Sequence, residues 1–182
     1  MYKTIGFVEF NSIAQGIEAA DFMLKAADVE LIFSKPVCPG KFILLVAGDV
    51  AAVNSAVEAG SSKGMQYVVD KLIISNVHPQ IIPAITGTSG IEEVNSLGVM
   101  EFFSIAGAVI SADVAAKSAL VQLMEIRLGV GIGGKSFVTL TGDVSAVKEA
   151  VNSGIRVAQE AGNLINYVVI PSPRKEVFAN LL

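Results

Sequence analysis

The chain has 182 residues, of which 52% are hydrophobic and only 16% charged, and its net charge is −4. Soluble domains usually carry about 25% charged residues, so this composition predicts a membrane protein, an unusually compact protein, or one that buries much of its exterior against other copies of the chain. The scattered Lys and Arg residues form no basic stripe that would follow a phosphate backbone, which argues against nucleic acid as a partner.

A membrane location is not expected either. The best candidate for a spanning segment, residues 99–121, is interrupted by Glu101, Asp113 and Lys117, whereas a spanning helix needs about 18 apolar residues. The N-terminus enters a strand-like pattern without the features of a secretory signal. The single cysteine, Cys38, agrees with a reducing compartment. We therefore expect a cytoplasmic protein.

The first half of the chain contains six predicted elements. Residues 3–10 are apolar and β-rich, and Ser12 is a good N-cap for a helix that runs to about Ala27. Strands are predicted at 29–33 and 42–47, and Asp49 is expected to cap a second helix that ends near Gly60. A last strand covers 67–74. The order β-α-β-β-α-β predicts a ferredoxin-like α+β fold.

The second half repeats the first. Residues 5–14 reappear as 97–106, an offset of 92 positions, and Gly40-Lys41 reappears as Gly134-Lys135, an offset of 94. Insertions usually lie in loops, so the two extra residues predict a variable loop at about 33–40 and 125–134. The small polar segment 86–90 is the expected linker. We therefore predict two tandem domains, residues 1–90 and 91–182.

Three features recur in both halves: the string Gly-Asp-Val-x-Ala-Val, the opening Gly-x-x-Glu-x-x-Ser-Ile-Ala followed by Ala-Asp-x-x-x-Lys, and a glycine-rich loop between the second and third strands. Together they resemble the bacterial microcompartment shell domain. The resemblance implies a tandem-domain shell protein, structural and not an enzyme, that forms a pseudohexameric homotrimer and tiles with other shell proteins. It also implies a location in the microcompartment shell, within the cytoplasm.

Cys38 lies in a segment, residues 34–42, that is similar to the corresponding loop of the tandem shell proteins of propanediol-utilisation compartments. In those proteins the loop cysteine binds an iron–sulfur cluster at the central pore. The resemblance implies one [4Fe–4S] cluster per trimer, shared by Cys38 of each subunit, for electron transfer or cluster transport across the shell. An encapsulated or cytosolic redox protein would then be a further partner.

The residues themselves leave alternatives open for Cys38. A lone cysteine is most often a buried apolar filler, but Pro36, Pro39 and Gly40 predict a rigid turn where no filler is needed. Threefold symmetry would bring three thiolates together, and cubane clusters usually take four. Lys35 and Lys41 would offset the charge of a cluster or simply be solvated. A shell trimer with an empty pore that gates small metabolites is the alternative, and a free ferredoxin-like redox carrier or enzyme is a third.

The predicted pore lining comes from the loops of both copies. Residues 129–134 fit the spacing G-x-G-x-x-G, but the dinucleotide fingerprint needs a following helix, and the run 137–140 is strand-like. A tight turn beside a pore is the better interpretation, since glycines allow close approach of backbones. The residues expected to line the pore are Pro36, Val37, Pro39, Gly40, Gly131, Ile132, Gly133 and Gly134.

Five further charged or titratable residues are candidates for a role: two recurring lysines, two recurring glutamates and the single histidine. Lys25 and Lys117 follow Asp21 and Asp113 by four residues, which is typical of a surface ion pair. The family resemblance instead implies that both lysines lie at the tile edge. His78 has no partner pattern for catalysis and is interpreted as a turn or interface residue. The repetition of Glu9 at Glu101 favours a structural bond over an acid/base role.

Overall fold

The computed structural model of the protein describes residues 3–91 and 93–178. The chain divides into two compact units, Met1–Val77 and His78–Leu182. In the part of the chain that the structure describes, no helix is long and apolar enough to cross a membrane.

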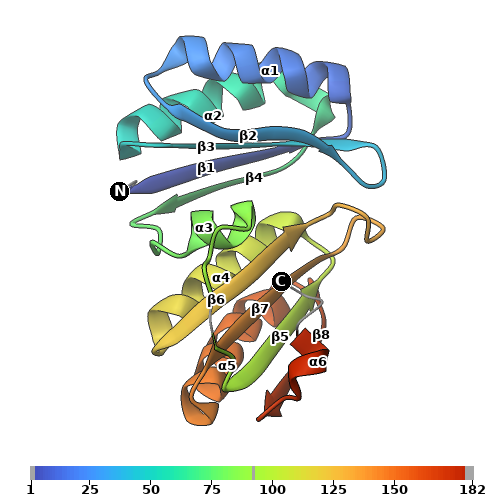
Figure 1. The fold of residues 1–182 in the computed structure, drawn as a ribbon. Coiled ribbons are helices and arrows are strands. Elements are labelled where there is room, and N and C mark those ends of the chain that lie inside the picture. Colours follow the sequence, from blue (N-terminus) through green and yellow to red (C-terminus); the bar gives the residue numbers. More distant parts are fainter. Residues whose placement is uncertain (1–2, 92, 179–182) are drawn as a thin grey trace. The chain divides into compact units, whose positions relative to one another are not determined.

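Unit 1 is a four-stranded antiparallel sheet covered by two helices on one face (Figure 1). The strand order is β2-β3-β1-β4, so β1 lies in the middle and β2 at an edge. The elements are β1 (Thr4–Phe10), α1 (Ile13–Ala26), β2 (Glu30–Val37), β3 (Lys41–Gly48), α2 (Val50–Gly64), the short 3-10 turn η1 (Met65–Tyr67) and β4 (Val68–Ser75).

Unit 2 repeats this arrangement with strand order β6-β7-β5-β8. It begins with a short helix, α3 (Ile81–Thr86), which has no counterpart at the start of unit 1. The other elements are β5 (Ser96–Phe102), α4 (Ile105–Ser118), β6 (Val121–Leu128), β7 (Ser136–Gly142), α5 (Val144–Glu160), β8 (Leu164–Pro171) and α6 (Lys175–Phe178). The predicted β-α-β-β-α-β order is thus confirmed in both copies.

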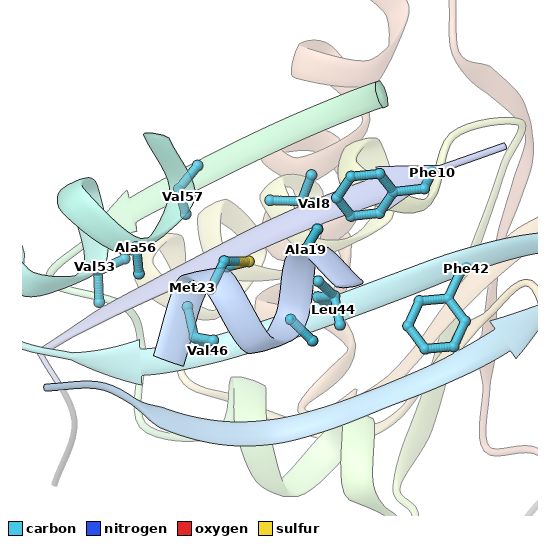
Figure 2. Packing of buried hydrophobic residues seen from close by; sticks show 11 residues of the cluster. Val8, Phe10, Ala19, Met23, Phe42, Leu44, Val46, Val53, Ala56 and Val57 are labelled. Atoms are coloured by element: carbon cyan, nitrogen blue, oxygen red, sulfur yellow. The ribbon is translucent and has the colours of Figure 1, made fainter. Parts of the chain in front are cut away.

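The core of unit 1 lies between the helices and the sheet. Figure 2 shows Phe10 of β1, Met23 of α1 and Val57 of α2 pointing into the same apolar layer. Gly6 explains how α2 comes so close to β1, because a Cβ at Gly6 would lie 2.5 Å from Val57 Cγ2. The matching Gly98 has three side-chain carbons at 2.9 Å from its would-be Cβ. Both glycines in the repeated motif therefore permit close packing of a helix on the central strand.

The hairpin turns are shorter than predicted. β2 continues to Val37 and β6 to Leu128, so residues 33–37 of the first expected loop and 125–128 of the second are strand, because they pair with β3 and β7. The two extra residues do lie in the turn: Pro36 pairs with Phe42 in the first copy and Leu128 with Ser136 in the second. The helix predicted to end near Gly60 continues to Gly64.

Residues 78–90 belong to unit 2, so the structure divides the chain earlier than the expected boundary at residue 90. α3 packs against β6 and α4. The Gln80 side chain donates from Nε2 to the Val121 carbonyl (3.1 Å), and its Oε1 accepts from the Leu123 amide (2.6 Å). This side chain therefore satisfies backbone groups of the edge strand β6, as edge strands require.

Candidate functional site

The turn between β2 and β3 carries the only cysteine of the chain. Strand pairing ends at Val37 and Lys41, and the Gly40 amide closes the turn by donating to the Val37 carbonyl (2.9 Å). Gly40 has φ of +96°, and no atom lies within 4 Å of its would-be Cβ. The backbone conformation, and not lack of space, therefore favours glycine here.

Cys38 is a free, half-buried thiol in this turn and does not belong to the apolar core. Of the neighbours expected to line a pore, Pro36, Pro39 and Gly40 are exposed. Val37 is only 6% exposed, so its side chain packs inside the chain and leaves only its backbone for a surface role. The structure thus brings Cys38, Pro39 and Gly40 together at the hairpin tip.

The turn between β6 and β7 is a glycine-rich loop. Gly131, Gly133 and Gly134 all have positive φ (74°, 66° and 83°), and the Gly129 amide donates to the Lys135 carbonyl (3.0 Å) across the base of the loop. Gly131 and Gly133 are exposed, while Ile132 and Gly134 are half-buried. Strand β7 follows directly, so the helix that a dinucleotide site requires is missing from this position.

An ion pair anchors each turn to the central strand of its sheet. Lys41 Nζ lies 2.6 Å from Glu9 Oε1, and Lys135 Nζ lies 3.1 Å from Glu101 Oε1. The Glu9 side chain is 4% exposed, whereas that of Glu101 is 37% exposed. The structural role predicted for the two glutamates is thus confirmed, whereas their pairing with Lys41 and Lys135 was not predicted from the sequence.

The two lysines beside Cys38 in the sequence already have partners within unit 1. Lys41 pairs with Glu9. Lys35 Nζ lies 4.8 Å from the centre of the Phe33 ring, a cation–π distance. Burial lowers the pKa of Lys35 below its usual value of 10.5, because desolvation disfavours the charged ammonium.

The lysines expected at the tile edge form the predicted i,i+4 ion pairs on α1 and α4. Lys25 lies 2.5 Å from Asp21, with the two side chains 72% and 55% exposed. Lys117 lies 2.5 Å from Asp113, whose side chain is 7% exposed. Asp113 also accepts from the His78 amide (2.7 Å), so the second pair is more enclosed than the first.

His78 is a turn residue in the structure. Its amide donates to Asp113, and its Nδ1 accepts from the Gln80 amide (3.4 Å) just before α3. The predicted turn role is therefore confirmed. The helix α3 itself was not predicted, although Ile81, Ala84 and Ile85 have helical spacing and are all buried.

Within residues 3–91 and 93–178, no three His, Cys, Asp or Glu side chains lie close enough to hold a metal ion together. One chain supplies a single thiol, Cys38. Any cluster held by cysteine would therefore need thiols from several copies of the chain.

The BMC domain family matches residues 4–77 and 96–173, that is, both repeated units. The chain is similar to the bacterial microcompartment shell protein PduT of Citrobacter freundii, with 40% identity over 182 residues that cover all of this chain and 99% of PduT. Shell protein EutK of Escherichia coli is 39% identical over 66 residues, which cover 36% of this chain and 40% of EutK.

Solved structures agree with the sequence relatives. The crystal structure of a microcompartment protein from Desulfitobacterium hafniense DCB has a TM-score of 0.94 and 53% identity, covering 98% of this chain and 99% of that chain. A fused permuted hexameric shell protein of the RMM microcompartment, 21% identical over 86% of this chain and 81% of its own, shares the fold with a TM-score of 0.61. With both units matched and the whole length covered, the chain belongs to the BMC family of microcompartment shell proteins, which reside in the cytoplasm, and carries two BMC domains in tandem.

Proposed function

We propose that three copies of this chain form a ring that serves as a structural tile of a bacterial microcompartment shell, together with other shell proteins. The observation that carries this proposal is the presence of two BMC units in one chain. Three such chains place six units around one axis, which a closed homo-oligomer permits. The low charged fraction, 16%, supports an exterior that is largely covered by neighbours.

The second part of the proposal is that Cys38 of the three chains binds one shared [4Fe–4S] cluster in the central pore. Its position at a hairpin tip, half-buried and outside the core, supports a binding role over that of an apolar filler. Thiolates are the ligands that such clusters take, usually four. Three chains supply three, which leaves one iron for water or an outside ligand. When bound, the cluster would supply one-electron transfer.

Metal analysis of anaerobically purified protein tests the cluster. We expect about four iron and four sulfide ions per three chains, and their loss in Cys38→Ser without a change in particle mass. Pro39→Ala is the matched control, since it alters the same turn but keeps the thiol. If the wild-type protein contains no iron, or if Cys38→Ser contains as much iron as the wild type, the proposed cluster is contradicted. The proposed tile is not affected by either result.

A second candidate is an empty pore that gates small metabolites. The exposed, positive-φ glycines Gly131 and Gly133 favour it, since their backbone is open to solutes. We expect Gly131→Leu to slow passage of small solutes through assembled shells while Cys38→Ser leaves passage unchanged. If instead Cys38→Ser changes the passage of solutes and Gly131→Leu does not, the thiol and not the glycine loop controls the pore. A free redox carrier, the third alternative, requires a chain that stays monomeric at every concentration tested.

The tile-edge role of Lys25 and Lys117 is also part of the proposal. Lys25 supports it best, because its side chain is 72% exposed although it pairs with Asp21. We expect Lys25→Ala to abolish extended sheets in electron micrographs while the ring mass persists. Lys148→Ala, at an exposed position of α5, is the control and should tile like the wild type.

A further inference from the structure

The two copies of the BMC unit cover the same surface differently. On α1, Ile13 and Ile17 are 42% and 57% exposed. Their counterparts on α4, 92 positions later, are Ile105 and Val109, which are 2% and 0% exposed. On the edge strands, Leu31 of β2 is half-buried, whereas Leu123 of β6 is 1% exposed. Unit 1 therefore presents an apolar surface that its copy in unit 2 does not.

We call this surface, made of Ile13, Ile17 and Asp21 of α1 and Leu31 of β2, the acceptor face.

In unit 2 the segment that contains α3 lies against two of the corresponding residues, Asp113 and Leu123. Ile81 and Ala84 of this helix are fully buried, and α3 packs on β6 and α4. Two polar contacts fix the segment. The His78 amide donates to Asp113 on α4, and Gln80 bonds the backbone of the edge strand.

The second copy carries an equivalent segment at the C-terminal end of the chain. Ser75 at the end of β4 and Pro171 at the end of β8 pair with the matching residues Thr4 and Ser96. The next residues, Asn76 and Ser172, share an unusual positive φ of 55° and 49°, so the turns after the two strands have the same form. Continuing the alignment, His78, Gln80 and Ile81 correspond to Arg174, Glu176 and Val177. Val177 in α6 is 49% exposed.

We propose that residues 172–177 of one chain dock on the acceptor face of a second copy, as the α3 segment covers β6 and α4. This inference rests on the proposed ring and names one of its contacts. By the in-chain template, the Arg174 amide donates to Asp21 as the His78 amide donates to Asp113. The Glu176 carboxylate accepts from the Leu31 amide as Gln80 Oε1 accepts from Leu123, and Val177 covers apolar surface on the acceptor face.

Charge complementarity supports a second copy as the partner. Beside the acceptor face, Asp28 and Glu30 stand where unit 2 has the uncharged Leu120 and Gln122. The docking segment changes in the opposite sense overall, since Arg174 and Lys175 replace His78 and Pro79 and add two positive charges, while Glu176 replaces Gln80 and adds one negative charge. Asp28 and Glu30 also line an open hollow of about 520 Å³ at the start of β2. Opposite charges on two surfaces that must meet favour the correct partner.

The docking segment and the acceptor face are different surfaces of one chain, so their contact is heterologous. Repetition of a heterologous contact with a fixed rotation closes a ring. Covering the exposed edge of β2 would also protect an edge strand that otherwise invites unspecific pairing. The same contact therefore accounts for both the ring and the protection of the edge.

Two charge insertions test the contact in the full chain. Ile17→Glu places a carboxylate on the acceptor face, and Val177→Glu places one on the docking segment. Both sites are exposed in the single chain, so far-UV circular dichroism should be unchanged. We expect each variant to need at least about tenfold more protein to form the ring, measured by mass photometry over a dilution series. Val50→Glu, at a 47% exposed apolar position of α2, is the matched control and should behave as the wild type.

The possible results distinguish a failure of this contact from a failure of the proposed ring. If the wild type forms the ring and either charged variant also forms it at all dilutions, this contact is wrong, but the proposed tile is unaffected. A wild-type chain that is monomeric throughout the series refutes the ring itself, and the contact with it. A loss of the ring in Val50→Glu as well would show a general effect of surface charge and would also overturn the specific contact.

Discussion

Glu9 brings a carboxylate into the centre of the first sheet, where its side chain is 4% exposed and Lys41 is its partner at 2.6 Å. Removing one partner of a buried pair leaves the other charge desolvated and unpaired. We expect Lys41→Met to lower the free energy of unfolding by about 2 to 4 kcal/mol, measured as a shift of the urea midpoint of unit 1.

The second copy supplies the control for this prediction. Lys135 and Glu101 form the equivalent pair, but their side chains are 47% and 37% exposed. An exposed pair contributes at most about 1 kcal/mol, so Lys135→Met should cost clearly less. Equal losses in the two variants would show that burial of Glu9 is not what makes its partner important.

Lys35 allows a prediction about pH, because burial lowers its pKa below 10.5 in the folded chain. The folded state then binds this proton less tightly than the unfolded state, so the Lys35 contribution to stability rises as pH rises through the folded pKa toward 10.5. We expect Lys35→Met, which carries no charge, to be most favourable relative to the wild type near pH 7. Its advantage should shrink toward pH 10.5 in thermal midpoints. A difference that stays constant or grows with pH contradicts the assigned cause.

At the residue scale the sequence located the turn that carries Cys38 but not the contacts made by the neighbouring side chains. The pattern of proline and glycine around Cys38 predicted a turn because these residues restrict or extend the backbone locally. Lys41 was expected beside a cluster or in solvent, yet it pairs with Glu9, which lies 32 positions away in sequence. Such a pair depends on the register of β1 against β3, and one sequence without its pairing partners does not specify that register.

At the N-caps of the helices, residue type alone does not decide whether the side chain makes a cap bond. Ser104 Oγ accepts from the Gly107 amide at 3.0 Å and caps α4. Asp143, at the N-cap of α5, makes no side-chain bond of this kind. We expect Ser104→Ala to cost about 1 kcal/mol and Asp143→Ala less, compared by urea unfolding. A larger loss in Asp143→Ala would mean that its charge at the helix start outweighs a cap bond.

Element ends were the least predictable part of the fold. β2 continues past residue 33 because residues 33–37 pair with β3, a long-range contact that polar Ser34 and Lys35 do not signal. α2 continues beyond Gly60 to Gly64, since Gly60 packs against Met23 and does not end the helix. In both cases tertiary packing overrides the local preference of glycine or polar residues.

At the scale of the whole molecule, the internal repeat could be predicted from the sequence, whereas the position of the boundary between the two units could not. An internal repeat constrains a fold strongly, because each element is predicted twice. The boundary was placed at residue 90 since residues 86–90 are small and polar. The structure instead joins residues 78–90 to unit 2, because α3 packs on β6. A short apolar helix before a polar linker contains no local signal for which neighbour it covers.

Fragments of the chain test this division directly. The fragment 78–182 keeps α3, whereas 91–182 lacks it and leaves the edge of β6 without Gln80. Loss of the buried side chains of Ile81 and Ile85 should cost about 3 kcal/mol or more. For a domain of this size we expect a thermal midpoint lower by about 10 °C or more, followed by circular dichroism.

The same segment gives the matched control when it is added to the other unit. Fragments 1–77 and 1–90 differ only by residues 78–90, whose polar contacts named above are all with unit 2. We therefore expect similar thermal midpoints for these two fragments. A contrary result would be a fragment 1–90 with a much higher thermal midpoint than 1–77, together with equal midpoints for fragments 91–182 and 78–182. The helix α3 would then belong to unit 1 in solution. The α3 packing would then no longer serve as a template for the contact between chains, because the covered face of unit 2 would need another explanation.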